Sequence, residues 1–147
     1  MARVLFNLDR FLNAQEPVYA AVLAELRAGR KLTHWMWFVF PQLTGLGRSE
    51  MAQYYGLDGL AEAAAYLRHP VLGARLRACT AIVNGLDGVT AVGIFGMPDA
   101  LKFRSCTTLF ELVEAGSEFS RALEKYFDGQ RDERTLALAG RSDGPEG

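Results

Sequence analysis

The residues best suited to chemistry fall in two short stretches of the chain. The first, from His34 to Gln42, combines a histidine, both tryptophans of the protein and a closing Pro-Gln pair. The second runs from Lys102 to Thr108, where six of the seven residues carry a hydrogen-bonding side-chain group, if the thiol of Cys106 is counted as a weak one. We expect the two stretches to face each other across a pocket.

The first stretch offers a proton donor or acceptor, a ring and an amide. Histidine exchanges a proton near neutral pH, so His34 is the candidate general acid or base, although a histidine at a helix start can simply bond a backbone carbonyl. Trp37 would flank an aromatic ring of a ligand, but core packing is the simpler explanation for either tryptophan. Gln42 follows Pro41 where the chain leaves the core, so its amide either faces a cavity or stabilises a turn.

The second stretch offers cations and hydroxyl groups. Lys102 and Arg104 would hold an anion, Arg104 through a bidentate pair. Ser105 lies three residues after Lys102, a spacing that a lysine-activated serine nucleophile would accept. Lys102 can also pair on the surface with Asp99, three residues before it. Polar groups surround this helical stretch on all sides, so some of them must point inward and meet partners there.

Arg48 is a further candidate for anion binding. It follows Gly45-Leu46-Gly47, and a glycine loop before a helix exposes backbone N–H groups, although a solvated arginine is the simpler explanation. With only two His and two Cys residues, and with no CxxC spacing of Cys79 and Cys106, we do not expect a structural zinc site with the usual ligands. The sequence predicts no metal and no cofactor.

A single folded domain has to position these residues. The chain has 147 residues, of which 50% are hydrophobic and 22% charged, a globular composition that can bury about two thirds of the unfolded surface. A formal net charge of −1 and scattered Lys and Arg residues argue against binding to nucleic acid or a membrane surface. No apolar segment reaches the ~20 residues that a membrane span needs, so we expect a cytoplasmic protein.

Apolar residues recur at helical spacing along most of the chain, and no alternation of period two exceeds four residues. The pattern predicts an all-α fold, a single compact multihelical domain of about eight helices over residues 1–139, with a disordered tail over residues 140–147. Glu25 lies outside the apolar stripe of the helix that follows Pro17. The aromatic stretch fits a buried strand or helix, and we favour a short helix capped by Thr33. Further N-caps are expected at Asp9, Ser49, Asp58, Thr90, Ser117 and Asp132.

Three segments together carry a family resemblance. They are His34 to Gln42 with the following Gly45-Leu46-Gly47, the segment that begins at His69-Pro70, and the segment from Ile94-Phe95-Gly96 to Thr108-Leu109-Phe110. In this order and spacing they resemble a bacterial family known as domain-of-unknown-function family 1810, sometimes labelled calpastatin, from about Leu8 to about Leu138. The resemblance implies an all-helical cytoplasmic protein and brings no activity, substrate or cofactor.

Two hypotheses of different classes follow. In the first, the pocket between the two stretches binds a small anionic molecule, either nucleotide-like or a carboxylate-bearing metabolite, with His34 and, more remotely, Ser105 as catalytic groups. In the second, the protein is a non-enzymatic module that binds a protein partner, which predicts an exposed apolar patch and no concave polar pocket. The sequence makes no prediction of the oligomeric state. Nucleic-acid binding would require seven arginines to lie on one face of the protein: Arg10, Arg27, Arg30, Arg48, Arg75, Arg77 and Arg104.

Overall fold

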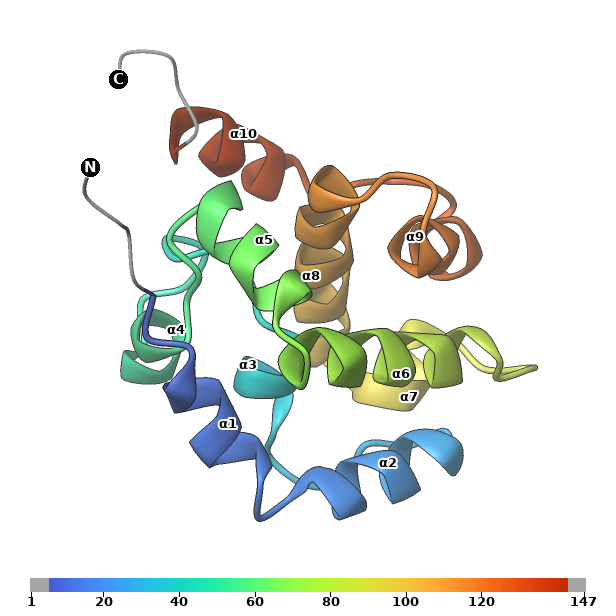
Figure 1. Ribbon diagram of the computed structural model, residues 1–147. Helices are drawn as coiled ribbons and strands as arrows, with labels where there is room; N and C mark the ends of the chain where they lie inside the picture. Colours follow the sequence, from blue (N-terminus) through green and yellow to red (C-terminus); the bar gives the residue numbers. More distant parts are fainter. Residues whose placement is uncertain (1–5, 143–147) are drawn as a thin grey trace.

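Helix α8 (Asp99–Val113) is the central element of the protein (Figure 1). The structure, a computed structural model, describes residues 6–142, and in that range it contains ten α-helices and no β-strand. Around α8 pack α5 (Leu60–Arg68), α7 (Ala91–Phe95), α9 (Glu118–Phe127) and α10 (Glu133–Ser142). Because α8 is enclosed in this way, every residue from 105 to 110 is buried.

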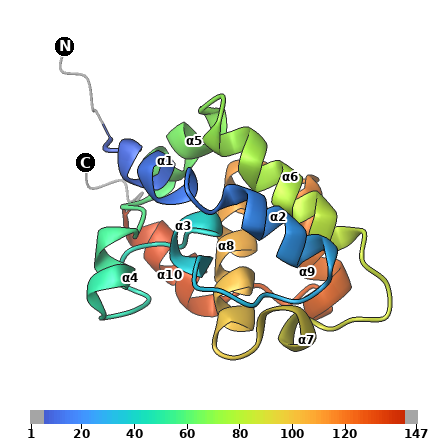
Figure 2. The same ribbon diagram turned by 90° about the horizontal axis from the view of Figure 1, so that it is seen from below.

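The other helices form the remaining wall of the core. On the side of the molecule nearest the viewer in Figure 2, α1 and α2 lie in front of α3 and α8. Helix α1 packs on α3, and α2 packs on α6. These helices are α1 (Asp9–Gln15), α2 (Tyr19–Arg27), α3 (Met36–Val39), α4 (Glu50–Tyr54) and α6 (Leu72–Asn84).

The all-helical prediction is confirmed for the described residues, but the expected count of about eight helices is too low. Three of the ten helices have only four or five residues: α3, α4 and α7. Single turns of this length are not stable in isolation, so tertiary packing determines whether they form. None of the described helices is long and apolar enough to cross a membrane.

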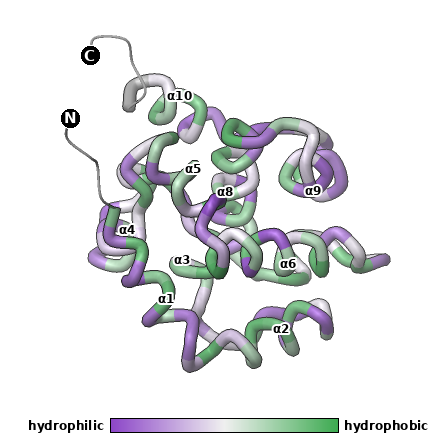
Figure 3. Tube along the Cα trace, viewed as in Figure 1, coloured by the Kyte–Doolittle hydropathy of each residue, from purple (hydrophilic) through white to green (hydrophobic). Residues whose placement is uncertain are grey.

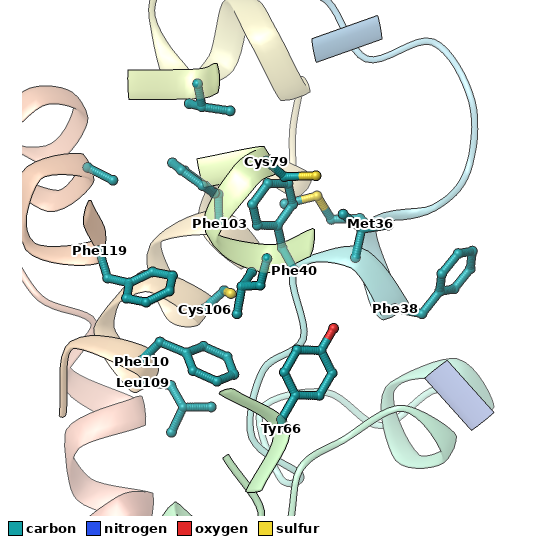
Figure 4. Close-up of a cluster of buried hydrophobic side chains, with 14 of the residues drawn as sticks. Met36, Phe38, Phe40, Tyr66, Cys79, Phe103, Cys106, Leu109, Phe110 and Phe119 are labelled. Carbon is teal, nitrogen blue, oxygen red and sulfur yellow. The ribbon is translucent and has the colours of Figure 1, made fainter. Parts of the chain in front are cut away.

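The core is built largely from aromatic side chains. Phe103 of α8 stacks on Phe95 with ring centroids 4.7 Å apart and meets Phe40 edge-on at 5.1 Å. Figure 4 shows Phe40 and Phe103 in the same cluster as the two cysteines, Cys79 and Cys106. Both cysteines are free and buried, and burial raises the pKa of both thiols above the usual range. They act as small apolar groups of the core.

Helices α8 and α9 differ in how much of their surface is covered. In Figure 3, hydrophobic and hydrophilic residues alternate along α9. This helix buries three side chains, Phe119, Ala122 and Leu123, packs Tyr126 and Phe127 partly against the core, and exposes Arg121, Glu124 and Lys125. The contrast explains why polar residues on α9 can rely on water, whereas those on α8 need partners inside the protein.

Some predicted helix starts are confirmed and others are wrong. Ser49, Thr90 and Ser117 each accept a backbone N–H at the start of their helices, and Asp132 accepts the N–H of Thr135 at 3.1 Å. Three expected caps are wrong. Asp9 is already the first residue of α1, Gly59 replaces Asp58 as the N-cap of α5, and Thr33 precedes α3 without capping it.

The aromatic stretch forms a helix over only part of its length. Helix α3 is limited to Met36–Val39, and His34 lies before it instead of at its start. At the other end of the chain, α10 continues to Ser142, which places residues 140–142 of the predicted tail in a helix. Residues 143–147 of that tail lie outside the described residues.

Candidate functional site

A hollow of about 330 Å³, the central pocket, lies where the end of the aromatic stretch meets the starts of α8 and α10. Three segments far apart in the sequence build it, because α8 packs against α10 while the chain after α3 folds back beside α8. Its volume is at the lower end of the range of about 300–1,000 Å³ for small-molecule pockets. The lining residues are Trp37, Gln42, Leu46, Gly47, Pro98, Leu101, Lys102, Arg104, Ser105, Asp132 and Arg134.

Five of the seven residues predicted for the site line this pocket: Trp37, Gln42, Lys102, Arg104 and Ser105. The structure therefore brings the two chemistry-bearing stretches of the sequence together. His34 and Arg48, which are both exposed, do not line it. The role of each residue in binding or catalysis remains a prediction.

Lys102 is held between a carboxylate and a ring. Its Nζ donates to Asp99 Oδ1 at 2.9 Å and lies 4.1 Å from the ring centroid of Trp37. The other oxygen of Asp99 pairs with Lys31 at 2.9 Å. Burial alone would raise the pKa of Asp99, but hydrogen bonds from the two lysines outweigh it and hold that pKa below its usual value. Asp99 thus fixes Lys102 at the pocket wall as a cation.

Arg104 has donors to spare. Its Nη2 lies 3.9 Å from Asp132 Oδ1, which is too long for a hydrogen bond, and its guanidinium carbon lies 5.9 Å from the ring centroid of Phe127. Its buried Nε has no hydrogen-bond partner among the described residues. A buried donor without a partner costs free energy, so the geometry leaves Arg104 able to gain from an added acceptor.

The Gln42 side chain is buried and unpaired. The residue is 8% exposed, and its backbone carbonyl accepts the N–H of Leu57 at 2.9 Å. Its amide makes no hydrogen bond to any residue in the range 6–142, and it lines the central pocket. The amide therefore offers a donor and an acceptor toward the hollow.

Ser105 is not activated by Lys102. The Ser105 hydroxyl lies 3.1 Å from the carbonyl of Leu101 and 3.2 Å from Asp132 Oδ2, while Lys102 bonds Asp99. A hydroxyl has one proton, so it can donate to only one of these acceptors at a time. The observed contacts tie α8 to α10, and the sequence spacing of Lys102 and Ser105 does not produce a dyad.

The prediction that polar groups of α8 must find partners inside is confirmed. Thr107 donates to the carbonyl of Phe103 at 2.9 Å, a bond within its own helix. Thr108 accepts the backbone N–H of Asp132 at 3.0 Å, which joins α8 to the start of α10. Both threonines are completely buried. The polar side chains at the end of this stretch therefore bond within the protein, and Lys102, Arg104 and Ser105 at its start line the pocket.

His34 lies beside a second, smaller hollow of about 150 Å³. Trp37 and Lys102 line both hollows, so the two are neighbours. The His34 side chain is exposed and makes no hydrogen bond in the described part of the chain. Arg48 is also exposed, and only its backbone carbonyl is engaged, by the amide of Gln53 at 3.0 Å.

Two charged lining residues, Asp132 and Arg134, were not predicted as part of the site. Arg134 donates to the carbonyls of Leu46 at 3.2 Å and Gly45 at 3.1 Å, which fixes the glycine loop over α10. Asp132 was identified as a helix cap but not as part of the pocket. The position of Asp132 at a helix start would have indicated a pocket residue only if the contact of α10 with α8 had been known. Arg134 belongs to no local motif, so its place in the pocket also depends on that contact.

The position of Glu25 differs from the prediction, and its carboxylate binds residues at the start of the aromatic stretch. It was expected outside the apolar stripe, yet it is 9% exposed and accepts the backbone N–H groups of Leu32 at 2.8 Å and Thr33 at 3.1 Å. It also accepts the Thr33 hydroxyl at 2.7 Å and the Trp35 indole N–H at 2.8 Å. Burial alone would raise the pKa of Glu25, but these bonds outweigh it and lower the pKa to about 2. Thr33 lies two residues before Trp35, the N-cap residue of α3, and its hydroxyl binds Glu25 instead.

Several of the arginines named for nucleic-acid binding pair with carboxylates of other elements. Arg10 pairs with Glu62, Arg75 with Glu16, and Arg77 with Glu114 and Glu118. These carboxylates offset part of the positive charge that nucleic-acid binding would use. Among the residues that the structure describes, no group of three or more His, Cys, Asp or Glu side chains could hold a metal ion.

Comparison with known proteins relates most of the chain to a solved structure. The crystal structure of the conserved hypothetical protein Rv1873 from Mycobacterium tuberculosis is similar, with a TM-score of 0.89 and 54% sequence identity. The similarity covers 90% of this chain and 96% of that one. None of the curated proteins compared with the chain matches it.

A family match covers nearly the whole chain. Residues 5–139 match the family described as protein of unknown function DUF1810. This range contains both tryptophans, the central pocket and Glu25. The chain therefore belongs to the DUF1810 family.

Proposed function

We propose that the central pocket binds a small molecule that carries an anionic group, either nucleotide-like or a carboxylate-bearing metabolite. The observation that supports it best is that Gln42 and Arg104, which come from different segments, line the same pocket and have side-chain groups without a hydrogen-bond partner among the described residues. Arg104 Nε is a buried donor without a partner, whereas buried polar groups are usually paired in folded proteins. A ligand acceptor would offset the free energy lost at Arg104 Nε, and the Gln42 amide would add a donor and an acceptor to the contact.

The anionic group of the ligand belongs near Arg104. Lys102, Arg104 and Arg134 place three cations on the wall against one carboxylate, Asp132. Lys102 is neutralised by Asp99, and Arg134 bonds loop carbonyls, so Arg104 has the most unused hydrogen-bonding capacity. A guanidinium group binds carboxylate or phosphate through two parallel bonds, which suits this position.

The remaining wall suits a non-ionic part of the ligand. Trp37, Pro98 and Leu101 supply apolar surface, and Gln42 supplies hydrogen bonds. The combination of apolar lining with a few polar groups is typical of small-molecule sites. The proposal covers binding alone, because Ser105 is engaged with α10 and His34 lies outside the pocket.

An interaction module remains the second candidate, and one observation favours it. Leu32, Val92, Met97 and Leu101 are large apolar residues that are 45–68% exposed. The backbone N–H of Lys31 donates to Ile94 at 2.7 Å, so the segment that carries Leu32 lies against α7, and Leu101 lines the central pocket. Exposed apolar side chains near each other are typical of protein-binding surfaces.

A thermal-shift screen tests the two candidates against each other. Purified protein is screened with nucleotides, sugar phosphates and carboxylates, together with the variants Arg104→Ala and Arg48→Ala. A ligand at a hundred times its dissociation constant stabilises the folded protein by about 2.7 kcal/mol. Arg48→Ala is the control, because it also removes one arginine, but an exposed one that lies outside the pocket.

We expect a stabilising ligand whose effect Arg104→Ala abolishes and Arg48→Ala retains. Equal loss in both variants would mean non-specific attraction to positive charge. No stabilisation across the panel, with all three proteins folded, would contradict the pocket and favour the interaction module.

A further inference from the structure

We infer that the ligand of the central pocket carries a planar heterocyclic base, and that Gln42 recognises the edge of this base. The inference rests on the proposed function and goes further, because it chooses the nucleotide-like class over simple carboxylates. It follows from the hydrogen-bonding capacity of Gln42, the surroundings of Trp37 and the size of the pocket.

Gln42 is held in place by its backbone and free at its side chain. Its carbonyl accepts the N–H of Leu57, and the next residue, Leu43, forms a parallel bridge with Leu57. These backbone contacts fix the position of Gln42 without engaging its side-chain amide. An amide presents a donor and an acceptor side by side, so its natural partner is a group with the complementary pair.

A second buried glutamine shows what a structural amide looks like in this protein. Gln15 is 1% exposed and donates to the carbonyl of Phe38 at 2.7 Å and to the hydroxyl of Tyr66 at 3.1 Å. Its oxygen also accepts from Arg75 at 3.3 Å. Gln42 is almost as buried and has none of these partners in the described chain, so its amide is available to a ligand.

Trp37 shares the wall with Gln42 and is also incompletely used. The Nζ of Lys102 lies over the Trp37 ring, 4.1 Å from its centroid. Its indole N–H makes no hydrogen bond within the described residues, and the ring is only partly buried. Its outer edge passes close to Gly47, where a Cβ atom, if the residue had one, would lie 4.0 Å from the ring and 2.9 Å from Ala52. The close approach of Ala52 requires glycine at this position, and the ring edge lies at an ordinary contact distance from it.

The partner that fits this wall is a base edge next to an aromatic surface. A glutamine amide pairs in bidentate fashion with the adjacent N6 donor and N7 acceptor of adenine, and aromatic side chains stack on bases. A volume of about 330 Å³ suits one nucleotide better than two. A mononucleotide would place its phosphate within reach of the cationic wall that contains Arg104.

Calorimetric titration of the full chain with three phosphates tests the inference. The probes are adenosine 5′-monophosphate, ribose 5-phosphate, which lacks the base, and phenyl phosphate, which has a ring without a donor–acceptor edge. The proteins are wild type, Gln42→Leu, Gln42→Glu and Arg104→Ala. Gln42→Glu retains the size and one acceptor of the amide but removes its donor, so it covers the case in which Gln42→Leu fails to fold.

We expect wild type to bind adenosine 5′-monophosphate roughly tenfold to a hundredfold more tightly than either other phosphate. Gln42→Leu and Gln42→Glu should remove most of this preference, Gln42→Leu without weakening ribose 5-phosphate, and Arg104→Ala should weaken all three probes.

Equal binding of the three phosphates, lost in Arg104→Ala, would overturn base recognition and leave the anion site intact. A preference for adenosine 5′-monophosphate that both Gln42 variants retain would also overturn it. Absence of binding by every probe would overturn this inference together with the proposed site for phosphate ligands.

Discussion

Trp35 and Trp37 are two residues apart, yet they belong to two different kinds of polar surroundings. Trp35 is 1% exposed and donates its indole N–H to Glu25, whose carboxylate also accepts two backbone N–H groups and a hydroxyl. Trp37 is partly exposed, and its wall contains the unpaired Gln42 amide and Arg104 Nε.

The two surroundings differ in whether their polar groups already have hydrogen-bond partners. Around Trp35, each oxygen of Glu25 accepts hydrogen bonds, so nothing is left for a ligand to add. Around Trp37, donors and acceptors remain unused, so a ligand can gain from them. A buried carboxylate such as Glu25 is therefore explained by the fold alone, whereas the Gln42 amide has no bond among the described residues that would explain it in the same way.

Loss of Glu25 should have the largest effect on stability. Glu25→Ala leaves four donors without their acceptor, two of them on the backbone before α3. We expect the free energy of unfolding to fall by about 3–5 kcal/mol, measured by urea denaturation. Glu50→Ala, which removes an exposed glutamate in the first turn of α4, should cost less than about 1 kcal/mol and is the control. Equal losses in the two variants would contradict a structural role for Glu25.

Acid should remove the same stabilisation in a defined pH window. The folded-state pKa of Glu25 is about 2 against an ordinary value of 4.5, so its contribution is complete above pH 4.5 and is lost as pH falls toward 2. The shift corresponds to about 3 kcal/mol. We therefore expect the stability difference between wild type and Glu25→Gln to decrease steadily between pH 4.5 and 2. A difference independent of pH across this window would show that the Glu25 carboxylate contributes no charge-dependent stability.

Replacement of each tryptophan by phenylalanine compares the two surroundings directly. Trp35→Phe removes a buried N–H donor to Glu25 and leaves a small void, so we expect a loss of about 2 kcal/mol. Trp37→Phe removes an unpaired N–H at the pocket wall and should cost less than about 1 kcal/mol. Thermal unfolding of both variants measures the contrast, and the reverse order would assign the structural role to Trp37.

The smallest effect is expected at Gln42. Gln15→Leu breaks bonds to Phe38, Tyr66 and Arg75 and should cost about 1–2 kcal/mol of unfolding free energy. Gln42→Leu breaks no side-chain bond within residues 6–142 and should leave stability within about 0.5 kcal/mol of wild type, or raise it slightly. Chemical denaturation of the matched pair tests this. A large loss in Gln42→Leu would mean that the amide serves the fold instead of a ligand.

Part of the lining of the central pocket was predictable from residue type and spacing. The polar stretch from Lys102 to Thr108 could not be fully solvated on a helix, and five predicted residues from it and the aromatic stretch do line one pocket. Its hydroxyl groups, however, divide between the pocket and the packing of α10. Sequence spacing cannot make that division, because it depends on which helix covers each face.

The sequence by itself determined that the chain is helical, where several of the helices begin, and that the stretches from His34 to Gln42 and from Lys102 to Thr108 have an unusual composition. Helical periodicity and side-chain caps act within a few residues, so they are visible locally. Only the tertiary structure decided that Glu25 turns inward, that Asp132 and Arg134 join the pocket, and that His34 and Arg48 stay outside it. Each of these outcomes depends on a partner far along the chain or on the direction in which a side chain leaves its loop, and neither is encoded in spacing alone.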